Sequence, residues 1–264
     1  MNPAGQVVLL TGASAGIGAA TAHAFAQAGA QLVLVARDRN RLEAIRQALP
    51  AGRHTIIPAD LGSPTAVASL AEQVLATCGP PALVIHNAGV GLAAPIATMP
   101  AADLQQALAV NLFGPLQLTQ ALLPTMRARG HGQLIFVSST VGLRALPYLG
   151  GYAASKAALD RITEALRVEL HGSGIVVTLI RPGTTNTGFS GHRLGQGHEI
   201  RHRNTPGVAP ELVAQTILRA AINEPRIAYV RPLDRLIVWF GLLAPRLTDR
   251  LLGRSFGWQE APPS

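Results

Sequence analysis

Short apolar runs alternate with longer helical patterns along most of this chain. The first runs, rich in Val, Leu and Ile, cover residues 6–10, 31–36, 55–58 and 82–85. Strands with nearly continuous apolar character are typical of parallel sheets buried on both faces, in which the connections supply the helices. We therefore expect an α/β fold, a doubly wound parallel sheet with helices on both faces.

No internal repeat or low-complexity linker divides the 264 residues, which suit one α/β domain. We place this domain at residues 1–231, with a helix at 210–223 and a short strand at 227–230 near its end. Residues 184–208 are rich in Gly and His and have no clear periodicity. A long irregular connection of this kind is usually functional, so we expect a lid that determines which substrate binds.

The C-terminal extension, residues 232–264, has an unusual pattern. Nine consecutive uncharged residues, Leu236 to Ala244, include Trp239 and Phe240, and arginines flank them at positions 231, 235, 246, 250 and 254. The run is shorter than the roughly 20 residues that cross a bilayer. Two interpretations of the segment 233–253 remain open: a helical cap on the pocket or on a second subunit, and peripheral contact with a membrane surface.

The formal net charge of +8 does not indicate a nucleic-acid-binding protein. Residues 1–183 carry 12 basic and 8 acidic groups and residues 184–264 carry 10 and 6, with no long basic run. No nucleic-acid-binding module is present, and we expect no such partner. The single cysteine, Cys78, excludes an internal disulfide, and the N-terminus lacks a secretory signal pattern. We therefore expect a cytoplasmic protein, with association at the inner face of a membrane as the alternative.

The only lysine of the chain stands four residues after a tyrosine. Of 22 basic residues 21 are arginine, and the exception is Lys156, which follows Tyr152. On a helix such a pair lies on one face, about 5–6 Å apart. A compact ammonium beside a phenol favours the phenolate. We therefore expect Lys156 to lower the pKa of Tyr152 towards the range of general acid–base catalysis.

A glycine-rich segment, Thr11 to Gly18, lies between the first apolar run and a helical stretch at 19–28. Glycines let the backbone approach a pyrophosphate, and a helix N-terminus favours the negative charge. The second run is followed by Arg37, 19 residues after Gly18, with Arg39 and Arg41 nearby. An arginine at this place accommodates the 2′-phosphate of NADP, so we expect NADP(H) in preference to NAD(H).

Further motifs follow in an order that resembles the short-chain dehydrogenase/reductase family in its single-domain form of about 250 residues. Between about residues 5 and 230 they are Thr11–Gly18, Asp60-Leu61, Asn87-Ala88-Gly89, Asn111, Ser139, Tyr152 with Lys156, Arg181-Pro182-Gly183 and Thr187. The resemblance implies a Rossmann-type fold and hydride transfer between NADP(H) and a carbonyl or secondary alcohol. It also implies a homodimer or homotetramer. A non-catalytic NADP(H)-sensing or scaffold protein of the same fold is the alternative.

The resemblance also implies the residue roles. The catalytic residues are Ser139, Tyr152, Lys156 and Asn111, with Asn111 orienting Lys156 through a water. The cofactor-binding residues are Gly12, Ser14, Gly16, Ile17, Gly18, Arg37, Asp60, Leu61, Asn87, Ala88, Gly89, Tyr152, Lys156, Pro182, Gly183 and Thr187. The apolar C-terminal segment favours a lipophilic substrate, of sterol, retinoid or acyl-chain type.

Other polar residues receive more ordinary interpretations. We expect His86 to be a hydrogen-bonded core residue, and the remaining histidines show no spacing that indicates a metal site. Tyr148 is a candidate for the wall of the substrate pocket. Arg144, in the same loop, is expected to be solvated.

Overall fold

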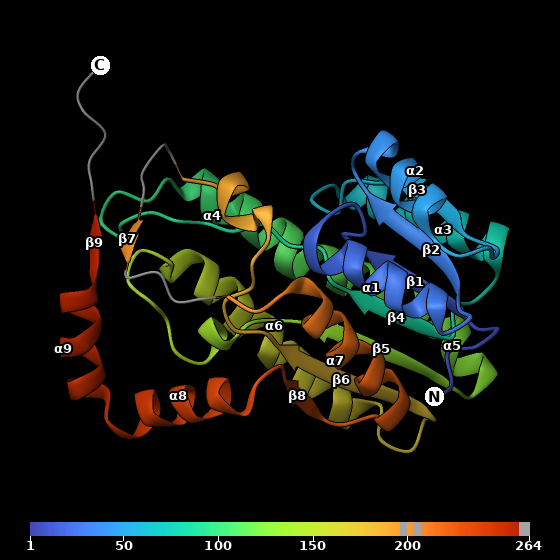
Figure 1. The fold of residues 1–264 in the computed structure, drawn as a ribbon. Helices are drawn as coiled ribbons and strands as arrows, with labels where there is room; N and C mark the ends of the chain where they lie inside the picture. The colour runs from blue at the N-terminus through green and yellow to red at the C-terminus, as the bar shows by residue number, and fades with distance from the viewer. Residues whose placement is uncertain (196–199, 203–206, 259–264) are drawn as a thin grey trace.

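A seven-stranded parallel sheet runs through the centre of the protein (Figure 1), in a computed structural model that describes residues 1–195, 200–202 and 207–258. The strands stand in the order β3-β2-β1-β4-β5-β6-β8. Their bounds are β1 Val7–Thr11, β2 Gln31–Ala36, β3 Thr55–Pro58, β4 Leu83–His86, β5 Gly132–Val137, β6 Ile175–Arg181 and β8 Ile227–Tyr229. The apolar runs of the sequence thus form the expected sheet.

The strand order reverses at β1, which pairs with β2 on one side and with β4 on the other. Leu10 of β1 is in register with Leu34 of β2 and with Ile85 of β4. In open α/β sheets a crevice forms at such a reversal, outside the carboxyl ends of the strands. The expectation of a doubly wound, Rossmann-type sheet is confirmed.

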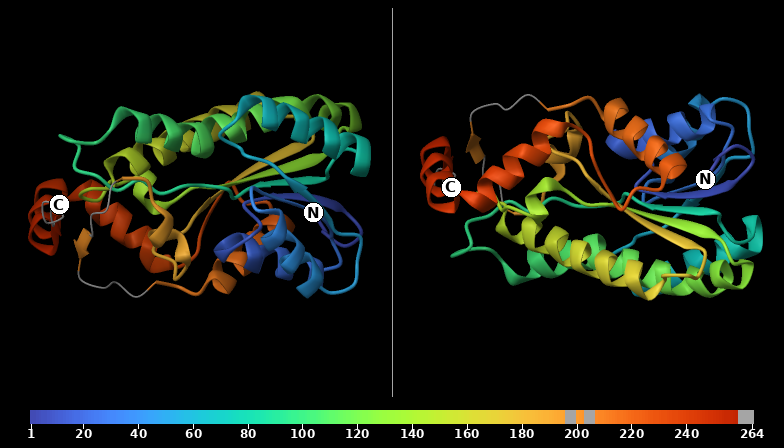
Figure 2. Two further views of the ribbon diagram at one scale, coloured as in Figure 1. Left: turned by 90° about the horizontal axis from the view of Figure 1, so that it is seen from above. Right: turned by 90° about the horizontal axis from the view of Figure 1, so that it is seen from below.

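Helices cover both faces of the sheet (Figure 2). On one face lie α1 (Gly16–Gln27), α2 (Arg39–Ala48) and α7 (Pro210–Asn223), and on the other lie α3 (Pro64–Cys78), α5 (Gly114–Arg129) and α6 (Gly150–Glu169). Phe25 of α1 and Ile217 of α7 are fully buried in the first core layer, and Leu70 and Leu118 lie in the second. Burial on both faces explains why the strands read as continuous apolar runs.

The connection expected to be irregular, 184–208, contains a 3-10 turn at Gly188–His192 and the strand β7, Ile200–His202. Its segments 196–199 and 203–206 lie outside the described residues. The helix α4 (Ala101–Leu108) precedes α5.

The C-terminal extension forms two helices, α8 (Pro232–Leu243) and α9 (Pro245–Ser255), because Pro245 cannot continue the first one. The strand β9 (Phe256–Trp258) follows and pairs antiparallel with β7. In Figure 1 both helices stand at the end of the molecule opposite α2 and α3. Residues 259–264 of the extension lie outside the described part. Among the described residues, none of the helices is long and apolar enough to cross a membrane.

Candidate active site

The turn between β1 and α1 brings backbone N–H groups to the carboxyl end of the sheet. Gly12 and Gly16 have φ angles of 69° and 52°, a left-handed conformation that favours glycine. A Cβ on Gly18 would lie 1.9 Å from the carbonyl oxygen of Gly12, so only glycine fits there. The N-cap residue of α1, Ala15, makes no side-chain cap, which leaves the first N–H groups of the helix to an anion. The other expected cofactor residues of this turn are Ser14 and Ile17.

The N-A-G segment after β4 is joined to this turn by hydrogen bonds. The amide of Asn87 donates to the carbonyl oxygens of Thr11 (3.0 Å) and Gly12 (3.2 Å). The Thr11 hydroxyl accepts from the backbone N–H groups of Asn87 and Ala88 and donates to Ile85. Thr11 was not among the site residues predicted from the sequence. Its place at the start of the glycine motif is the signal that could have identified it.

The end of β2 lies beside the glycine turn, because the N–H of Ala13 donates to the carbonyl oxygen of Val35 (3.1 Å). Arg37 follows directly and is exposed. It makes no ion pair within the part of the chain that the structure describes, whereas the neighbouring Arg41 pairs with Asp38. The guanidinium of Arg37 is therefore available to a phosphate.

The pair Asp60-Leu61 follows β3, and its two residues differ in solvent exposure. The Asp60 carboxylate is exposed and accepts from the N–H of Gly62 (2.9 Å), which holds the turn. Leu61 is buried, and its carbonyl oxygen would lie 2.4 Å from a Cβ on Gly114 at the start of α5. This close approach fixes the loop that carries both of these expected cofactor-binding residues.

The residues Ser139, Tyr152 and Lys156 meet where β5 ends and α6 begins. Tyr152 forms a hydrogen bond with Ser139, and the Lys156 ammonium lies 5.9 Å from the centre of the Tyr152 ring. Lys156 is buried and donates to the carbonyl oxygen of Val137 at 3.0 Å. The Ser139 hydroxyl also lies 3.4 Å from the carbonyl oxygen of Pro182, which belongs to the loop after β6. The three side chains thus form one group, the pair Tyr152 and Lys156 expected from its spacing and Ser139 expected from the family resemblance.

Asn111 lies in a π-helical turn, Ala109–Phe113, between α4 and α5. It is fully buried and pairs with the backbone of Val90 through two hydrogen bonds, of 2.8 and 2.9 Å. Its amide also donates to the hydroxyl of Ser155 (2.9 Å). Single π turns inside helices are frequent at functional sites. Asn111 therefore joins the end of β4 to the helix that carries Lys156.

The pKa values differ from the expectation that Lys156 makes Tyr152 more acidic. Burial raises the pKa of Tyr152, and the hydrogen bond from Ser139 offsets only part of this shift. Burial also lowers the pKa of Lys156 to about 8, against the favourable charge of Asp160. The prediction was wrong because desolvation of the phenolate is the largest influence on the pKa of Tyr152, and an ammonium 5.9 Å from the ring centre does not offset it. At neutral pH the phenol is protonated and the amine carries its charge.

The loop after β6 lies against both the glycine turn and Ser139. Pro182 is buried, and Thr187 packs so close to the glycine turn that a Cβ on Gly16 would lie 3.0 Å from its methyl carbon. Phe189 follows, with its ring centre 5.8 Å from that of Tyr152. Phe189 was not predicted from the sequence. An apolar aromatic residue in a Gly-rich lid is a weak signal by itself.

A buried ion pair supports α6 one turn beyond Lys156. Asp160 accepts from two guanidinium nitrogens of Arg181, at 3.1 and 2.9 Å, and both side chains are almost fully buried. Tyr229 of β8 also contacts Arg181, at 3.3 Å. Asp160 was not among the residues predicted from the sequence. Its spacing of four residues from Lys156 could have identified it.

The C-terminal helices touch the site through two contacts. A Cβ on Gly183 would lie 2.8 Å from the carboxylate of Asp234, a buried residue of α8 that also pairs with Arg231. Arg144, in the loop before α6, pairs with Asp249 of α9 and packs its side chain against Gly241. The expectation that Arg144 is simply solvated was therefore wrong.

His86 lies in the core, as expected. Its ring stacks on Phe136 with centres 4.6 Å apart, and Nε2 lies 2.9 Å from the Thr119 hydroxyl. Burial lowers its pKa to about 3, so the imidazole is neutral. No group of three or more metal-ligating side chains occurs among the residues described by the structure.

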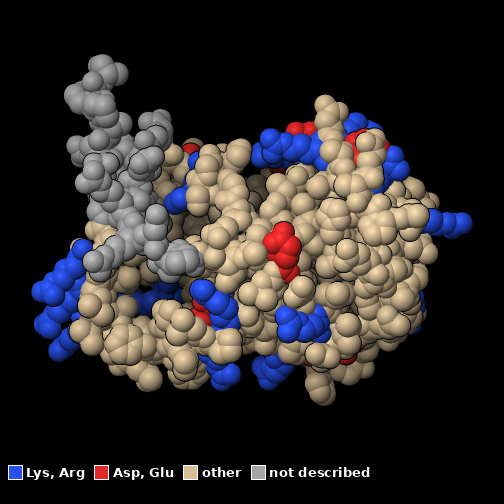
Figure 3. Space-filling model, viewed as in Figure 1, with Lys and Arg blue, Asp and Glu red and all other residues tan. Residues whose placement is uncertain are grey.

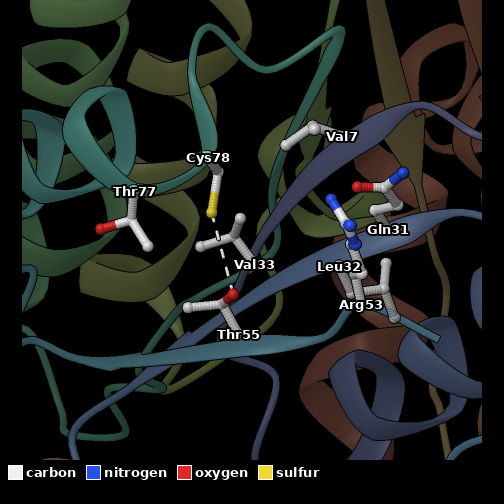
Figure 4. Close-up of a pocket in the computed structure, with 8 residues that line it drawn as sticks. All are labelled: Val7, Gln31, Leu32, Val33, Arg53, Thr55, Thr77 and Cys78. Atoms are coloured by element: carbon white, nitrogen blue, oxygen red, sulfur yellow. Dashed lines mark hydrogen bonds between the residues drawn. The ribbon is translucent and has the colours of Figure 1, made fainter.

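A pocket elsewhere in the fold lies beside the amino ends of β1, β2 and β3 (Figure 4). Arg53, Thr55 and the half-buried thiol of Cys78 contribute to its lining. Because open α/β sheets bind ligands at the carboxyl ends of their strands, this pocket is distinct from the candidate active site.

Comparison with known proteins shows the family of this chain. The short chain dehydrogenase family model matches residues 6–195, which include the glycine turn, Asn111, Ser139, Tyr152 and Lys156. The chain belongs to the short-chain dehydrogenase/reductase family. Its members are oxidoreductases that bind a nicotinamide nucleotide.

Relatives match nearly the whole chain. A "Dehydrogenase/reductase SDR family protein 7-like" from Anopheles gambiae is 35% identical over 254 residues, which cover 91% of this chain and 80% of the relative. The solved structure of a metagenomic short-chain oxidoreductase in complex with NADP has a TM-score of 0.74 at 30% identity, covering 88% of this chain and 99% of that one. A family structure from Burkholderia phymatum in complex with NAD, 23% identical, has a TM-score of 0.83 and covers 94% and 96%. At that identity it supports the fold alone.

Proposed function

We propose that this protein is an NADP(H)-dependent reductase of lipophilic ketones, or a dehydrogenase of the matching secondary alcohols. The observation that carries this proposal is the group of Tyr152, Ser139 and Lys156, in which a protonated phenol, a hydroxyl and a buried ammonium share one end of α6. A sensor or scaffold protein has no use for such an acid.

The residues of the cleft fit a dinucleotide. In the turn at residues 12–18 the three glycines carry no side chains, and the turn presents the uncapped N-terminus of α1, which suits a pyrophosphate. Asp60, Leu61 and the segment 87–89 border the expected adenine and ribose positions, while Pro182, Gly183 and Thr187 border the nicotinamide end. NADP(H), when bound, supplies or accepts the hydride. Arg37, which has no ion pair among the described residues, supports a preference for the 2′-phosphate.

The protein's own residues bind and protonate the substrate oxygen. Ser139 donates a hydrogen bond to it, so that negative charge developing there meets a fixed donor. Tyr152 then donates its proton to the same oxygen, and the raised pKa of the phenol keeps this proton in place before reaction. Lys156, charged at neutral pH, stabilises the phenolate that remains. In alcohol oxidation the step runs in reverse: the Tyr152 phenolate, stabilised by Lys156, accepts the proton of the alcohol.

The lipophilic character of the substrate is supported by the surroundings of the site. Phe189 covers Tyr152, and α8, whose exposed side chains are mostly apolar, touches the loop at Gly183. We further propose that the catalytic domain spans residues 1–231, and that the protein acts in the cytoplasm as a homodimer or homotetramer, as other family members do.

The test is a series of ketones of increasing chain length, from acetone to long-chain methyl ketones, with the loss of NADPH absorbance as readout. We expect turnover with kcat/KM rising along the series. NADPH binding without turnover of any ketone would support the sensor alternative. Turnover that is independent of chain length would contradict only the proposal that the substrate is lipophilic.

A further inference from the structure

The helix α8 presents its apolar side to the outside. Its buried residues are Asp234, Val238 and Gly241, two of which are polar or lack a side chain. Residues two positions away lie on the opposite face of a helix. That face carries Leu236, Trp239, Phe240 and Leu243, whose exposed fractions run from 48% to 79%. An ordinary surface helix has the reverse arrangement.

The exposed apolar surface is concentrated in one part of the molecule, which we call the C-terminal arm (residues 232–255). Nine of the fourteen exposed large apolar side chains among the described residues lie on it: Leu233, Leu236, Ile237, Trp239, Phe240, Leu242, Leu243, Leu247 and Leu251. The other five are scattered over the remaining elements. A contiguous patch of this kind indicates an interaction surface rather than chance exposure.

The helix α9 adds basic residues beside this surface. Leu247 and Leu251 stand two residues before and after Asp249, on the opposite face from its contact with Arg144. A stripe of arginines at every fourth position, Arg246, Arg250 and Arg254, runs beside these leucines. Basic side chains gather at the left edge of Figure 3, where α9 lies in Figure 1.

These arginines are available to an external anion. Within the described residues four arginines of the arm form no ion pair: Arg235, Arg246, Arg250 and Arg254. The two acidic residues of the arm already have partners, because Asp234 pairs with Arg231 and Asp249 with Arg144. The outer surface therefore combines apolar side chains with uncompensated positive charge.

The orientation of the arm is fixed by its inner contacts. Asp234 lies against Gly183, and the side chain of Arg144 packs on Gly241, where a Cβ would meet it at 3.2 Å. Rotation of α8 to bury its leucines would break both contacts and expose the carboxylate–guanidinium pair. The apolar face is thus held outward by polar anchors.

We propose that the C-terminal arm docks on the surface of an anionic lipid bilayer, with Leu236, Trp239, Phe240 and Leu243 among the acyl chains. Arginines then lie at the level of the anionic headgroups, as in other interfacial helices. Charge favours lipid over a second copy of this chain. A two-fold interface would bring the same unpaired arginines of both copies together, and their repulsion would oppose it.

The position of the arm adds a consequence that rests on the proposed function. Because α8 touches Gly183 and α9 holds the loop of Arg144, docking places the active site next to the bilayer. A lipophilic ketone would then enter from the membrane rather than from water. Vesicle binding is measured without substrate or cofactor. Failure of membrane docking can therefore be distinguished from failure of the proposed enzymatic function.

The experiment is co-sedimentation of the full chain with sucrose-loaded vesicles of phosphatidylglycerol and phosphatidylcholine, against vesicles of phosphatidylcholine alone. We expect binding to the anionic vesicles that weakens with added salt. Leu236→Glu/Leu243→Glu should lower the partition coefficient at least 100-fold. The matched control, Val168→Glu/Ile222→Glu, changes two exposed apolar residues outside the arm and should bind normally. Neutralising Arg246, Arg250 and Arg254 to Gln should weaken binding about 100-fold, at about fivefold for each arginine.

A second readout uses the fluorescence of Trp239. In the variant Trp258→Phe it is the only tryptophan, and its emission should shift to shorter wavelength with anionic vesicles. Unchanged vesicle binding in the arm variants, or none by the unaltered chain, overturns the proposal. Sedimentation equilibrium provides a further test. If Leu236→Glu/Leu243→Glu lowers the number of subunits while vesicle binding persists, the arm is a subunit interface and the proposal is overturned. Unchanged NADPH binding verifies that the variants are folded.

Discussion

The side-chain amide of Asn111 donates a hydrogen bond to the hydroxyl of Ser155, the residue that directly precedes Lys156 (2.9 Å). The Ser155 hydroxyl in turn donates to the carbonyl oxygen of Tyr152 (2.7 Å). One serine thus connects the π-helical turn to the helix segment between the phenol and the ammonium. Ser155 does not face the substrate oxygen in the proposed mechanism, so its role is to position the two groups that do.

Replacement of Ser155 by Ala should therefore lower kcat without a matching change in cofactor affinity. Loss of one hydrogen bond corresponds to about a tenfold effect on rate. Steady-state kinetics with a ketone substrate measures kcat, and fluorescence titration measures the Kd for NADPH. Ser173→Ala is the matched control, because its hydroxyl makes the same type of bond to Leu170 (2.6 Å) far from the site. Equal losses in both variants would show that only general stability is affected.

Replacement of Tyr152 by Phe should abolish proton transfer and leave the cleft intact. We expect kcat to fall by a factor of about 10²–10⁴, the usual contribution of a positioned acid. The Kd for NADPH should change less than about twofold, since the ring and the Lys156 ammonium remain. Tyr229→Phe, which removes a hydroxyl that contacts Arg181, serves as control. A Tyr152→Phe enzyme with near-normal rate would contradict the role proposed for the phenol.

Cofactor choice should depend on Arg37. In the proposed complex with NADP(H), Arg37→Asp would remove the cation that faces the 2′-phosphate and add a carboxylate that can accept from a ribose hydroxyl. Because hydrogen bonds to charged groups contribute about 1.5–3 kcal/mol, the ratio of kcat/KM for NADPH to that for NADH should fall about 100-fold. Arg53→Asp makes the same charge change at an exposed position near the other end of the strands and should leave the ratio unchanged. An unaltered ratio in Arg37→Asp would contradict the phosphate contact.

The sequence predicts those parts of this protein that depend on local pattern. Continuous apolar runs gave the buried strands, and the i, i+4 spacing of Tyr152 and Lys156 placed both on one side of α6. The glycine turn followed from the same reasoning, since Gly12 and Gly16 adopt a backbone conformation that other residues avoid.

Interactions between distant segments were not predictable in this way. The contact of Asp234 with Gly183 joins residues about fifty positions apart, and the pair of Asp160 and Arg181 depends on how α6 lies against β6. The pKa of Tyr152 was misjudged for the same reason. Spacing identifies a neighbouring charge, whereas the desolvation that outweighs it depends on packing around the whole site.

The lowered pKa of Lys156 has a measurable effect on stability. Its value of about 8 in the native state lies below the roughly 10.4 of an unfolded chain. Between these two pH values the unfolded state holds a proton that the native state has released. The free energy of unfolding therefore gains a contribution that rises with pH from about 8 to about 10.4, and the burial of the charged amine costs stability most below pH 8.

Lys156→Met should lack this contribution, because it fills a similar volume without a titratable group. Urea unfolding of both proteins at pH 7, 8, 9 and 10 measures the difference between their free energies of unfolding. We expect this difference to move in favour of the unaltered protein as pH rises, and parallel profiles would contradict a lowered pKa. In the same range kcat/KM for ketone reduction should decline above about pH 8, because a neutral amine no longer stabilises the phenolate left by proton donation.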